Sequence, residues 1–277
     1  MRYWLFVLFV FSSTTFAWNS VGHRIIAQIA YDQLTPTTKA KVDALTKNMF
    51  DSQYPDARFL KASTWPDEIR TKTSRYNSWH FIDLPFVKNN ATPEKINQQN
   101  VVTEIQRAEK IVPDTSQTLA RRAKYLSFLV HFVGDIHQPL HCAILYDDQF
   151  PHGDKGGNNY PIISDISNNL HWYWDEGLGL FHSQSDNYQF HYYQVEKIAD
   201  DWMKEYPRSF FGARLQNDSP QAWAQESHQL AVTFVYQIQP HASPSRDYVQ
   251  HGQTLVRQQI VLAGDRLADV LNRLFSS

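Results

Sequence analysis

The chain has 277 residues, of which 42% are hydrophobic and 19% charged, values that are typical of one large globular domain or two closely packed ones. Lys and Arg number 26 against 28 for Asp and Glu, so the formal net charge is -2. This balance excludes a protein that holds a polyanion through a general excess of basic side chains. Any polyanion bound here must meet a local positive charge that the composition does not count, such as bound metal.

The first 17 residues, MRYWLFVLFVFSSTTFA, contain one Arg, an apolar run and small polar residues that end at Ala17. This layout is typical of a secretory signal peptide. The alternative, a membrane anchor, is disfavoured because the apolar run is too short to cross a bilayer. We therefore expect residues 1–17 to be removed, and residues 18–277 to form one exported, monomeric domain without stable membrane association.

Nearly all periodic segments further along are of the helical type. Thr35 and Pro36 predict the start of a helix through Leu45, and Thr92 and Pro93 predict the start of another. The second helix carries apolar residues at helical spacing, namely Ile96, Val101, Ile105, Ala108 and Val112. Further helices are predicted at 116–137, where Pro139 ends the helix, and at 191–205, 219–238 and 246–275.

Strand candidates are few, namely Trp79–Leu84 and Tyr160–Ser164. The polar, Gly-containing segment 147–159 is predicted to be a loop, and a loop of this size in a compact domain is usually functional. The predicted fold class is therefore all-α.

The segment HFVGDIHQPLH, residues 131–141, places three histidines and an aspartate in an apolar run, where buried polar groups need partners. His131 and Asp135 are four residues apart, so on a helix they project from one face. His171 and Asp175 in NLHWYWD repeat this spacing. One such pair alone is better explained by a hydrogen bond in a core, but two pairs together with His141 favour metal ligands.

Three other segments offer further ligands: His23 in WNSVGH, Asp67 in WPDEIR and His80 in WHFID. An α-amino group has a pKa near 8 and binds metal once it is deprotonated. A mature chain that begins at Trp18 would supply such a group, which gives the predicted cleavage site a chemical meaning.

The chain resembles the zinc-dependent single-strand-specific nucleases of fungi and plants in segments that follow the same order: WNSVGH, WPDEIR, WHFID, HFVGDIHQPLH, GGN, NLHWYWD, WAQES and AGDRLADVLN. The resemblance extends from Trp18 to about Phe275, and the histidine segment together with the initial Trp makes it specific. It implies an all-helical domain with three zinc ions in a cleft.

The resemblance also implies a ligand set, position by position. One zinc would take Asp67, His80, His131 and one oxygen of Asp135. A second would take the amine and carbonyl of Trp18, His23 and the other oxygen of Asp135. The third would take His141, His171 and Asp175. Three Zn²⁺ ions (+6) against three ligand carboxylates (−3) leave a net +3, which would attract a phosphodiester.

The activity that the resemblance implies is hydrolysis of single-stranded DNA and RNA to 5′-nucleotides, with 3′-nucleotidase activity on 3′-nucleotides. Asp67 would orient the attacking water and Arg70 would clamp the phosphate. Phe81 would stack on an unpaired base, Asp83 would hydrogen-bond the edge of the base and Asn158 would complete the pocket. Without the resemblance, core packing is the simpler explanation of Phe81.

Two alternatives remain. Zinc-dependent phospholipase C has a similar fold, initial Trp and three-zinc site, but the nuclease pattern places the first His five residues after Trp18, as here, and has Asp at position 175 where the phospholipase has Glu. A non-catalytic zinc-binding protein is the other alternative, although sites that keep open positions favour catalysis.

Three expectations concern residues beside the ligands. The resemblance gives His137 no metal, so we predict that it either supports the ligands or has a structural role. Trp172 and Trp174 are predicted to pack around them. The fungal and plant enzymes use disulfides, whereas Cys142 is the only cysteine here, which suggests a bacterial exported protein.

Overall fold

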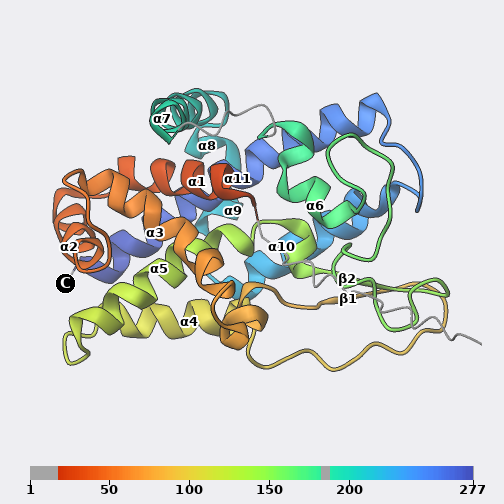
Figure 1. The fold of residues 1–277 in the computed structure, drawn as a ribbon, viewed down its shortest axis with the longest axis horizontal. Coiled ribbons are helices and arrows are strands. Elements are labelled where there is room, and N and C mark those ends of the chain that lie inside the picture. Colours follow the sequence, from red (N-terminus) through yellow and green to blue (C-terminus); the bar gives the residue numbers. More distant parts are fainter. Residues whose placement is uncertain (1–17, 182–187, 277) are drawn as a thin grey trace, which may run out of the picture.

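A computed structural model describes residues 18–181 and 188–276, and this part of the chain is almost wholly helical (Figure 1), which confirms the predicted all-α class. The predicted signal peptide, residues 1–17, lies outside the described residues. The helices are α1 (Ser20–Asp32), α2 (Pro36–Lys47), α3 (Pro55–Arg70), α4 (Val101–Ile111), α5 (Leu119–Asp135), α6 (Leu170–Asp175), α7 (Tyr188–Glu205), α8 (Arg208–Phe211), α9 (Ala213–Gln216), α10 (Pro220–Thr233) and α11 (Arg246–Phe275). Four 3₁₀ segments accompany them: η1 (Ser74–His80), η2 (Pro139–Cys142), η3 (Gly177–Gly179) and η4 (Val235–Gln237).

Side-chain caps mark the start of several of these helices, among them α1, α2, α4 and α5. Thr35 accepts a hydrogen bond from the Thr38 amide and Pro36 takes the first helical position, as predicted. The predicted start at Pro93 is wrong, because α4 begins at Val101 after a capping box between Asn100 and Thr103. Helices were correctly predicted near 116–137, 191–205, 219–238 and 246–275.

Both predicted strands are wrong. The two-stranded sheet pairs β1 (Pro85–Val87) in parallel with β2 (Ile144–Tyr146), while Tyr160–Ser164 contributes only an isolated bridge from Pro161 to Asn169. Trp79 lies in η1, where its ring packs against Phe128 at a centroid distance of 5.3 Å. The aromatic content of this segment therefore reflects packing on α5.

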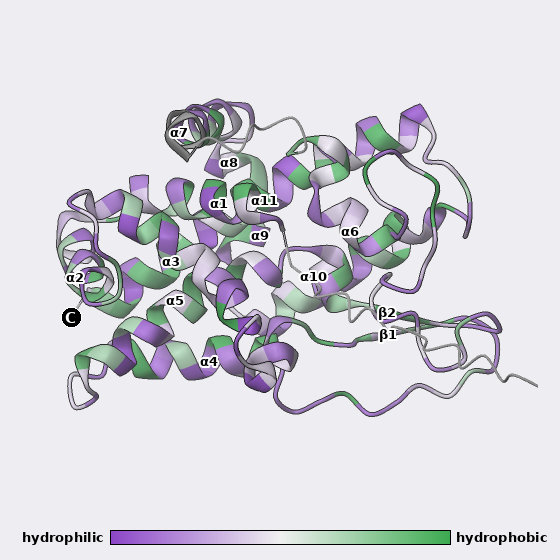
Figure 2. Ribbon diagram, in the orientation of Figure 1, coloured by the Kyte–Doolittle hydropathy of each residue, from purple (hydrophilic) through white to green (hydrophobic). Residues whose placement is uncertain are grey.

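The helices form a layered bundle around α1, which packs against α3, α7 and α11, while α3 packs on α5 and α5 on α4 (Figure 1). Figure 2 shows apolar and polar residues along the same helices, as expected for elements with one buried face. Gly264 of α11 allows a close approach to α1, since a Cβ atom there would lie 2.4 Å from Cγ2 of Ile29.

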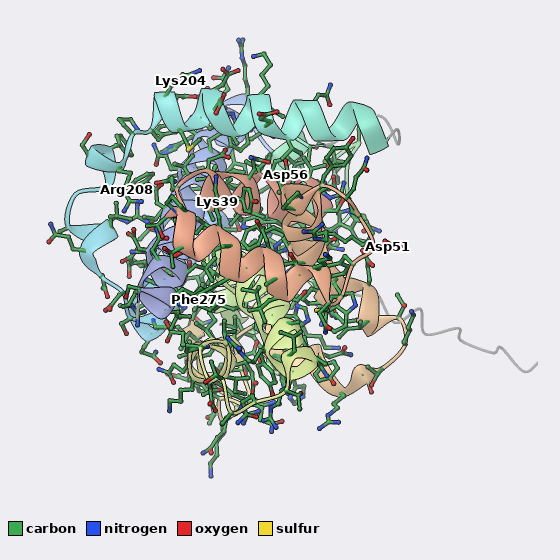
Figure 3. The ribbon with its side chains drawn as sticks, turned by 90° about the vertical axis from the view of Figure 1, so that its left-hand side faces the viewer. Lys39, Asp51, Asp56, Lys204, Arg208 and Phe275 are labelled. Carbon is green, nitrogen blue, oxygen red and sulfur yellow. The ribbon has the colours of Figure 1, made fainter. Side chains whose placement is uncertain are left out.

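The end of the bundle remote from the sheet carries charged residues from several helices. Figure 3 shows Lys39 of α2, Asp56 of α3, Lys204 of α7 and Arg208 of α8 on this side. Arg208 ties α8 to α11 through an ion pair of 2.6 Å with Asp269. Within the described ranges, the longest apolar stretches of helix fall short of what a membrane crossing requires.

Candidate metal centre

Three buried groups of histidine and aspartate side chains lie in the interior of the bundle. In each group the nearest nitrogen or oxygen atoms of the three side chains lie within 4.8 Å of one another. The groups are His23, His131 and Asp135; Asp67, His80 and His131; and His141, His171 and Asp175. The fold thus brings together the eight side chains that the sequence singled out as ligands.

Asp135 belongs to the first group and also contacts the histidines of the second. Its Oδ1 atom is 3.3 Å from Nε2 of both His23 and His131, and its Oδ2 atom is 2.9 Å from Nδ1 of His80. Oδ1 of Asp67 lies 3.6 Å from Nε2 of His131. The two oxygens of one carboxylate therefore face different histidines, as a bridging ligand requires.

Backbone carbonyls of α3 orient side chains of α5 near Pro66. Pro66 has no N–H to donate to the carbonyl of Ala62, which instead accepts a hydrogen bond of 2.6 Å from Oγ of Ser127 on α5. The next carbonyl, that of Ser63, accepts from Nδ1 of His131 at 2.6 Å. Because a carbonyl only accepts, Nδ1 carries the proton and Nε2 is left to face the two aspartates.

A glycine makes room for His23. A Cβ atom at Gly134 would lie 2.8 Å from Nδ1 of His23, so any larger residue would displace this ring. The rings of His23 and His131 stack with centroids 4.0 Å apart. Helices α1 and α5 thus approach closely enough for Asp135 to meet both rings.

Hydrogen bonds to the backbone also orient the third group. Nδ1 of His141 donates to the His80 carbonyl at 2.7 Å, and Nδ1 of His171 donates to the Gly156 carbonyl at 2.6 Å. Oδ1 of Asp175 accepts from Nε2 of Gln138 at 2.6 Å. In both histidines Nε2 is therefore the nitrogen that a metal would meet.

The break between α5 and η2 lets one short segment serve two groups. Helix α5 ends at Asp135 and Pro139 opens η2, which carries His141 to the third group. His137 lies outside the three groups, as predicted, because both of its ring nitrogens are hydrogen-bonded within the protein.

Burial and charge shift the pKa values of these groups strongly. Burial lowers the pKa of His80 to about 4 and raises that of Asp175 well above its usual range. Burial also opposes the charge on His131, but the carboxylates of Asp135 and Asp67 outweigh it and raise the pKa of His131 to about 9. A divalent cation would remove this conflict by neutralising the acids without protonating the histidines.

The donor set fits such a cation. Among the described residues, the buried Nε2 atom of His141 has no hydrogen-bond partner, which is costly unless a ligand meets it. Imidazole nitrogens and carboxylate oxygens are the ligands that zinc prefers after thiolates. The protein therefore offers sites suited to zinc.

One buried carboxylate near the centre escaped the sequence analysis. Asp154 accepts hydrogen bonds from the amides of Leu145 and Gly157 and from the hydroxyl of Tyr236, at 2.8 to 2.9 Å. It thereby fixes the loop whose Gly156 carbonyl orients His171. Its place before GG in GDKGGN was the only available signal.

The residues predicted to contact the substrate are Arg70, Phe81, Asp83 and Asn158, and they are less closely connected than the His/Asp groups. Nη1 of Arg70 lies 3.4 Å from Oδ1 of Asp67. Phe81 and Asp83 are half-buried in the segment between His80 and β1, and burial raises the pKa of Asp83 to about 6. Asn158 donates to the Lys155 carbonyl at 2.8 Å. Among the residues with described coordinates, no hydrogen bond or ring contact joins Phe81, Asp83 and Asn158 to one another.

The two tryptophans of HWYWD differ. Trp174 is fully buried and its Nε1 donates to the hydroxyl of Tyr248 at 3.0 Å, so it packs in the core, while packing around the ligands stays a prediction. Trp172 is 44% exposed, and the same prediction is wrong for it. On α6 the metal-facing side is set by His171 and Asp175, and Trp172 lies at its margin.

The fold and the site define the class of the protein: an all-helical bundle with three adjoining His/Asp groups that could hold metal. The sequence model of the S1/P1 nuclease family matches residues 18–276, and the chain belongs to this family. It is 28% identical to Endonuclease 4 of Arabidopsis thaliana over 281 residues, which cover 94% of this chain and 90% of the relative. It is 26% identical to Nuclease P1 of Penicillium citrinum over 94% of this chain and 98% of the relative. It is also 26% identical to Nuclease S1 of Aspergillus oryzae, over 59% of this chain and 55% of the relative. The protein is a nuclease, a hydrolase of phosphodiester bonds.

Proposed function

We propose that this protein is an exported, zinc-dependent endonuclease that hydrolyses single-stranded DNA and RNA to 5′-nucleotides and also removes phosphate from 3′-nucleotides. The observation that carries the proposal is the juxtaposition of three His/Asp groups, two of which share His131, in a chain of the S1/P1 nuclease family. Export rests on the signal-like residues 1–17.

Three zinc ions would be held as the sequence predicts: by Asp67, His80, His131 and Asp135; by Trp18, His23 and Asp135; and by His141, His171 and Asp175. Zinc bound there supplies a Lewis acid for the phosphodiester and lowers the pKa of water. Trp18 is fully buried one residue before the Asn19 cap of α1, so a chain that begins at Trp18 would have its amine beside the helix that carries His23.

Arg70 and Asp67 would act directly on the substrate. Nη1 of Arg70 lies 3.4 Å from Oδ1 of Asp67, and a guanidinium can donate two parallel hydrogen bonds to a phosphate. Asp67 has a second oxygen that can accept a proton from the attacking water and orient it. Both residues lie at the end of α3, so the helix fixes the clamp relative to the centre.

Preference for single strands would arise from Phe81, Asp83 and Asn158. An aromatic ring stacks on any base but only when the base is unpaired. Asp83 lies two residues beyond Phe81, and its carboxylate can accept hydrogen bonds from the edge of the stacked base. The backbone of Ile82 is tied to the His141 carbonyl at 2.8 Å, which places this segment beside the third group.

The test combines elemental analysis with turnover. Mature protein should contain about three zinc ions per chain and should cleave single-stranded DNA, RNA and 3′-AMP, but not phosphatidylcholine. The matched variants are Asp135→Asn, which should abolish turnover, and His251→Ala, an exposed histidine outside the three groups, which should not. Zinc content without turnover on any nucleic acid would favour a non-catalytic zinc protein, and hydrolysis of phosphatidylcholine alone would favour a phospholipase.

A further inference from the structure

The N-terminal end of α1 and the C-terminal end of α6 are tied together by one residue. The amide of Asn19 donates to the Asp175 carbonyl at 3.0 Å, and Nδ2 of Asn19 donates to Oε2 of Glu176 at 2.9 Å. The Oδ1 atom of the same side chain caps α1 by accepting from the amides of Val21 and Gly22. Every polar atom of the Asn19 side chain therefore has a defined partner.

The turn after Glu176 closes over the same place. Gly177, Leu178 and Gly179 all have positive φ angles, 59°, 53° and 94°, and this left-handed path returns the chain so that Phe181 meets Trp18 edge-on at a centroid distance of 6.5 Å. A left-handed backbone conformation is costly for a non-glycine residue such as Leu178. Burial of its side chain, which is only 1% exposed, offsets this cost. The fold thus maintains a strained turn where it holds the start of α1.

We propose that Asn19 and Glu176 are positioning residues that set the spacing between two parts of the metal centre. His23 lies one helical turn beyond Asn19 and belongs to the group with Asp135, whereas Asp175 immediately precedes Glu176 and belongs to the third group. A shift at the Asn19–Glu176 contact would move His23 relative to Asp175. This inference rests on the proposed metal-dependent function, although its main readout is zinc binding rather than activity.

The chemistry of the contact gives a sharp test. Asn19→Asp keeps an oxygen to cap α1, and an acidic cap is favourable at a helix N-terminus, so a purely local capping role predicts no loss of zinc binding. If the Asn19–Glu176 contact is instead a latch that sets the spacing, zinc binding should weaken, because the new carboxylate meets Glu176 without a donor between them. Glu176→Gln alone can still accept from Asn19 and should behave as wild type. In the double variant the glutamine donates to the new aspartate, so the contact returns with reversed polarity and unchanged net charge.

The measurements are zinc retained per chain against a competing chelator, and the rise in Tm that zinc produces over the metal-free protein. Asn19→Asp should lose zinc at about tenfold lower chelator concentration, and the double variant should recover to within about threefold of wild type. If Asn19→Asp retained zinc like wild type, or if the double variant retained it no better than Asn19→Asp, the latch would be overturned. Circular dichroism of the metal-free variants separates loss of spacing from loss of folding. Nuclease turnover is measured in parallel, so inactive wild-type protein would refute the proposed function while the zinc data still decide the latch.

Discussion

Nη1 of Arg266 donates a hydrogen bond of 2.9 Å to Nε2 of His137, whose Nδ1 in turn donates to the Val133 carbonyl at 2.7 Å. Burial and the positive charge of Arg266 hold the pKa of His137 well below its usual range, so this histidine is neutral. Nε2 of Gln259 donates to the His137 carbonyl at 3.0 Å. Two residues of α11, Arg266 and Gln259, therefore hydrogen-bond to His137 just beyond the end of α5. Both ring nitrogens of His137 are occupied by these contacts within the protein, so neither is available to a metal.

This arrangement separates Asp135 from His137 experimentally. Asp135→Asn replaces a carboxylate that faces three histidines with a neutral amide, and we expect loss of zinc and a fall in activity of more than about 100-fold. His137→Ala leaves Nη1 of Arg266 without its acceptor and should cost roughly 2–4 kcal/mol in free energy of unfolding, with zinc content retained. Zinc per chain and initial rates, measured where both variants are folded, provide the comparison. Equal losses of zinc would contradict the ligand assignment.

How far the sequence predicts this centre depends on which contacts are local. His131 with Asp135 and His171 with Asp175 are readable because helical spacing alone places each pair on one face. The start of α4 cannot be read from the sequence in this way, because Thr92-Pro93 and Asn100 are both good caps. The choice between them depends on tertiary burial, since Val101 is fully buried whereas Ile96 is 40% exposed. Asp154 was missed for the same reason, since its partners lie on three separate segments of the chain.

The role of the Trp18 amine can be tested by adding one residue. Protein that retains Ala17 has an amide nitrogen at Trp18 instead of an amine, and the new amine is displaced by about 3.8 Å. We expect it to bind one zinc ion fewer and to lose most activity, because an amide nitrogen is not basic enough to replace the amine. Intact mass identifies the N-terminus, and elemental analysis counts the metal. Full activity of a chain with an uncleaved leader would contradict the assignment of Trp18.

Phe81 should contribute to binding of single strands but not to the metal centre. Phe81→Ala removes the stacking surface, worth about 1–3 kcal/mol per base, and should raise KM for single-stranded DNA by tenfold or more at unchanged zinc content. Phe81→Trp preserves an aromatic surface and serves as the matched control. If both variants lose activity equally and unfold at lower temperature, Phe81 contributes to the core instead.

The proline in α3 predicts a measurable coupling with Ser127. In the wild type, Ser127→Ala leaves the Ala62 carbonyl buried without a donor and should cost about 1–3 kcal/mol. In a Pro66→Ala background the residue at 66 has an N–H that can donate to Ala62 along the helix, so the same serine substitution should cost less. Urea unfolding of the four proteins gives the coupling free energy. Additive costs would show that Ser127 stabilises the protein for some other reason.

Asp154 gives the protein a pH dependence of defined sign. Burial raises its pKa from 3.8 to about 6, despite three hydrogen-bond donors, so the folded state favours the protonated acid. Below about pH 4 the acid is protonated whether the chain is folded or unfolded, whereas above about pH 6 it is ionised in both states. Between these values the unfolded state releases its proton first, and the contribution of Asp154 to the free energy of unfolding therefore falls as pH rises, by roughly 1–3 kcal/mol in total.

Asp154→Asn cannot titrate, so the difference in stability between wild type and this variant should shrink from pH 4 to pH 6 and stay constant above. Urea unfolding of metal-free protein avoids interference from zinc release, and the exposed Asp165→Asn variant is the control. Parallel curves for wild type and Asp154→Asn would mean that the three donors, rather than burial, determine the protonation of this acid.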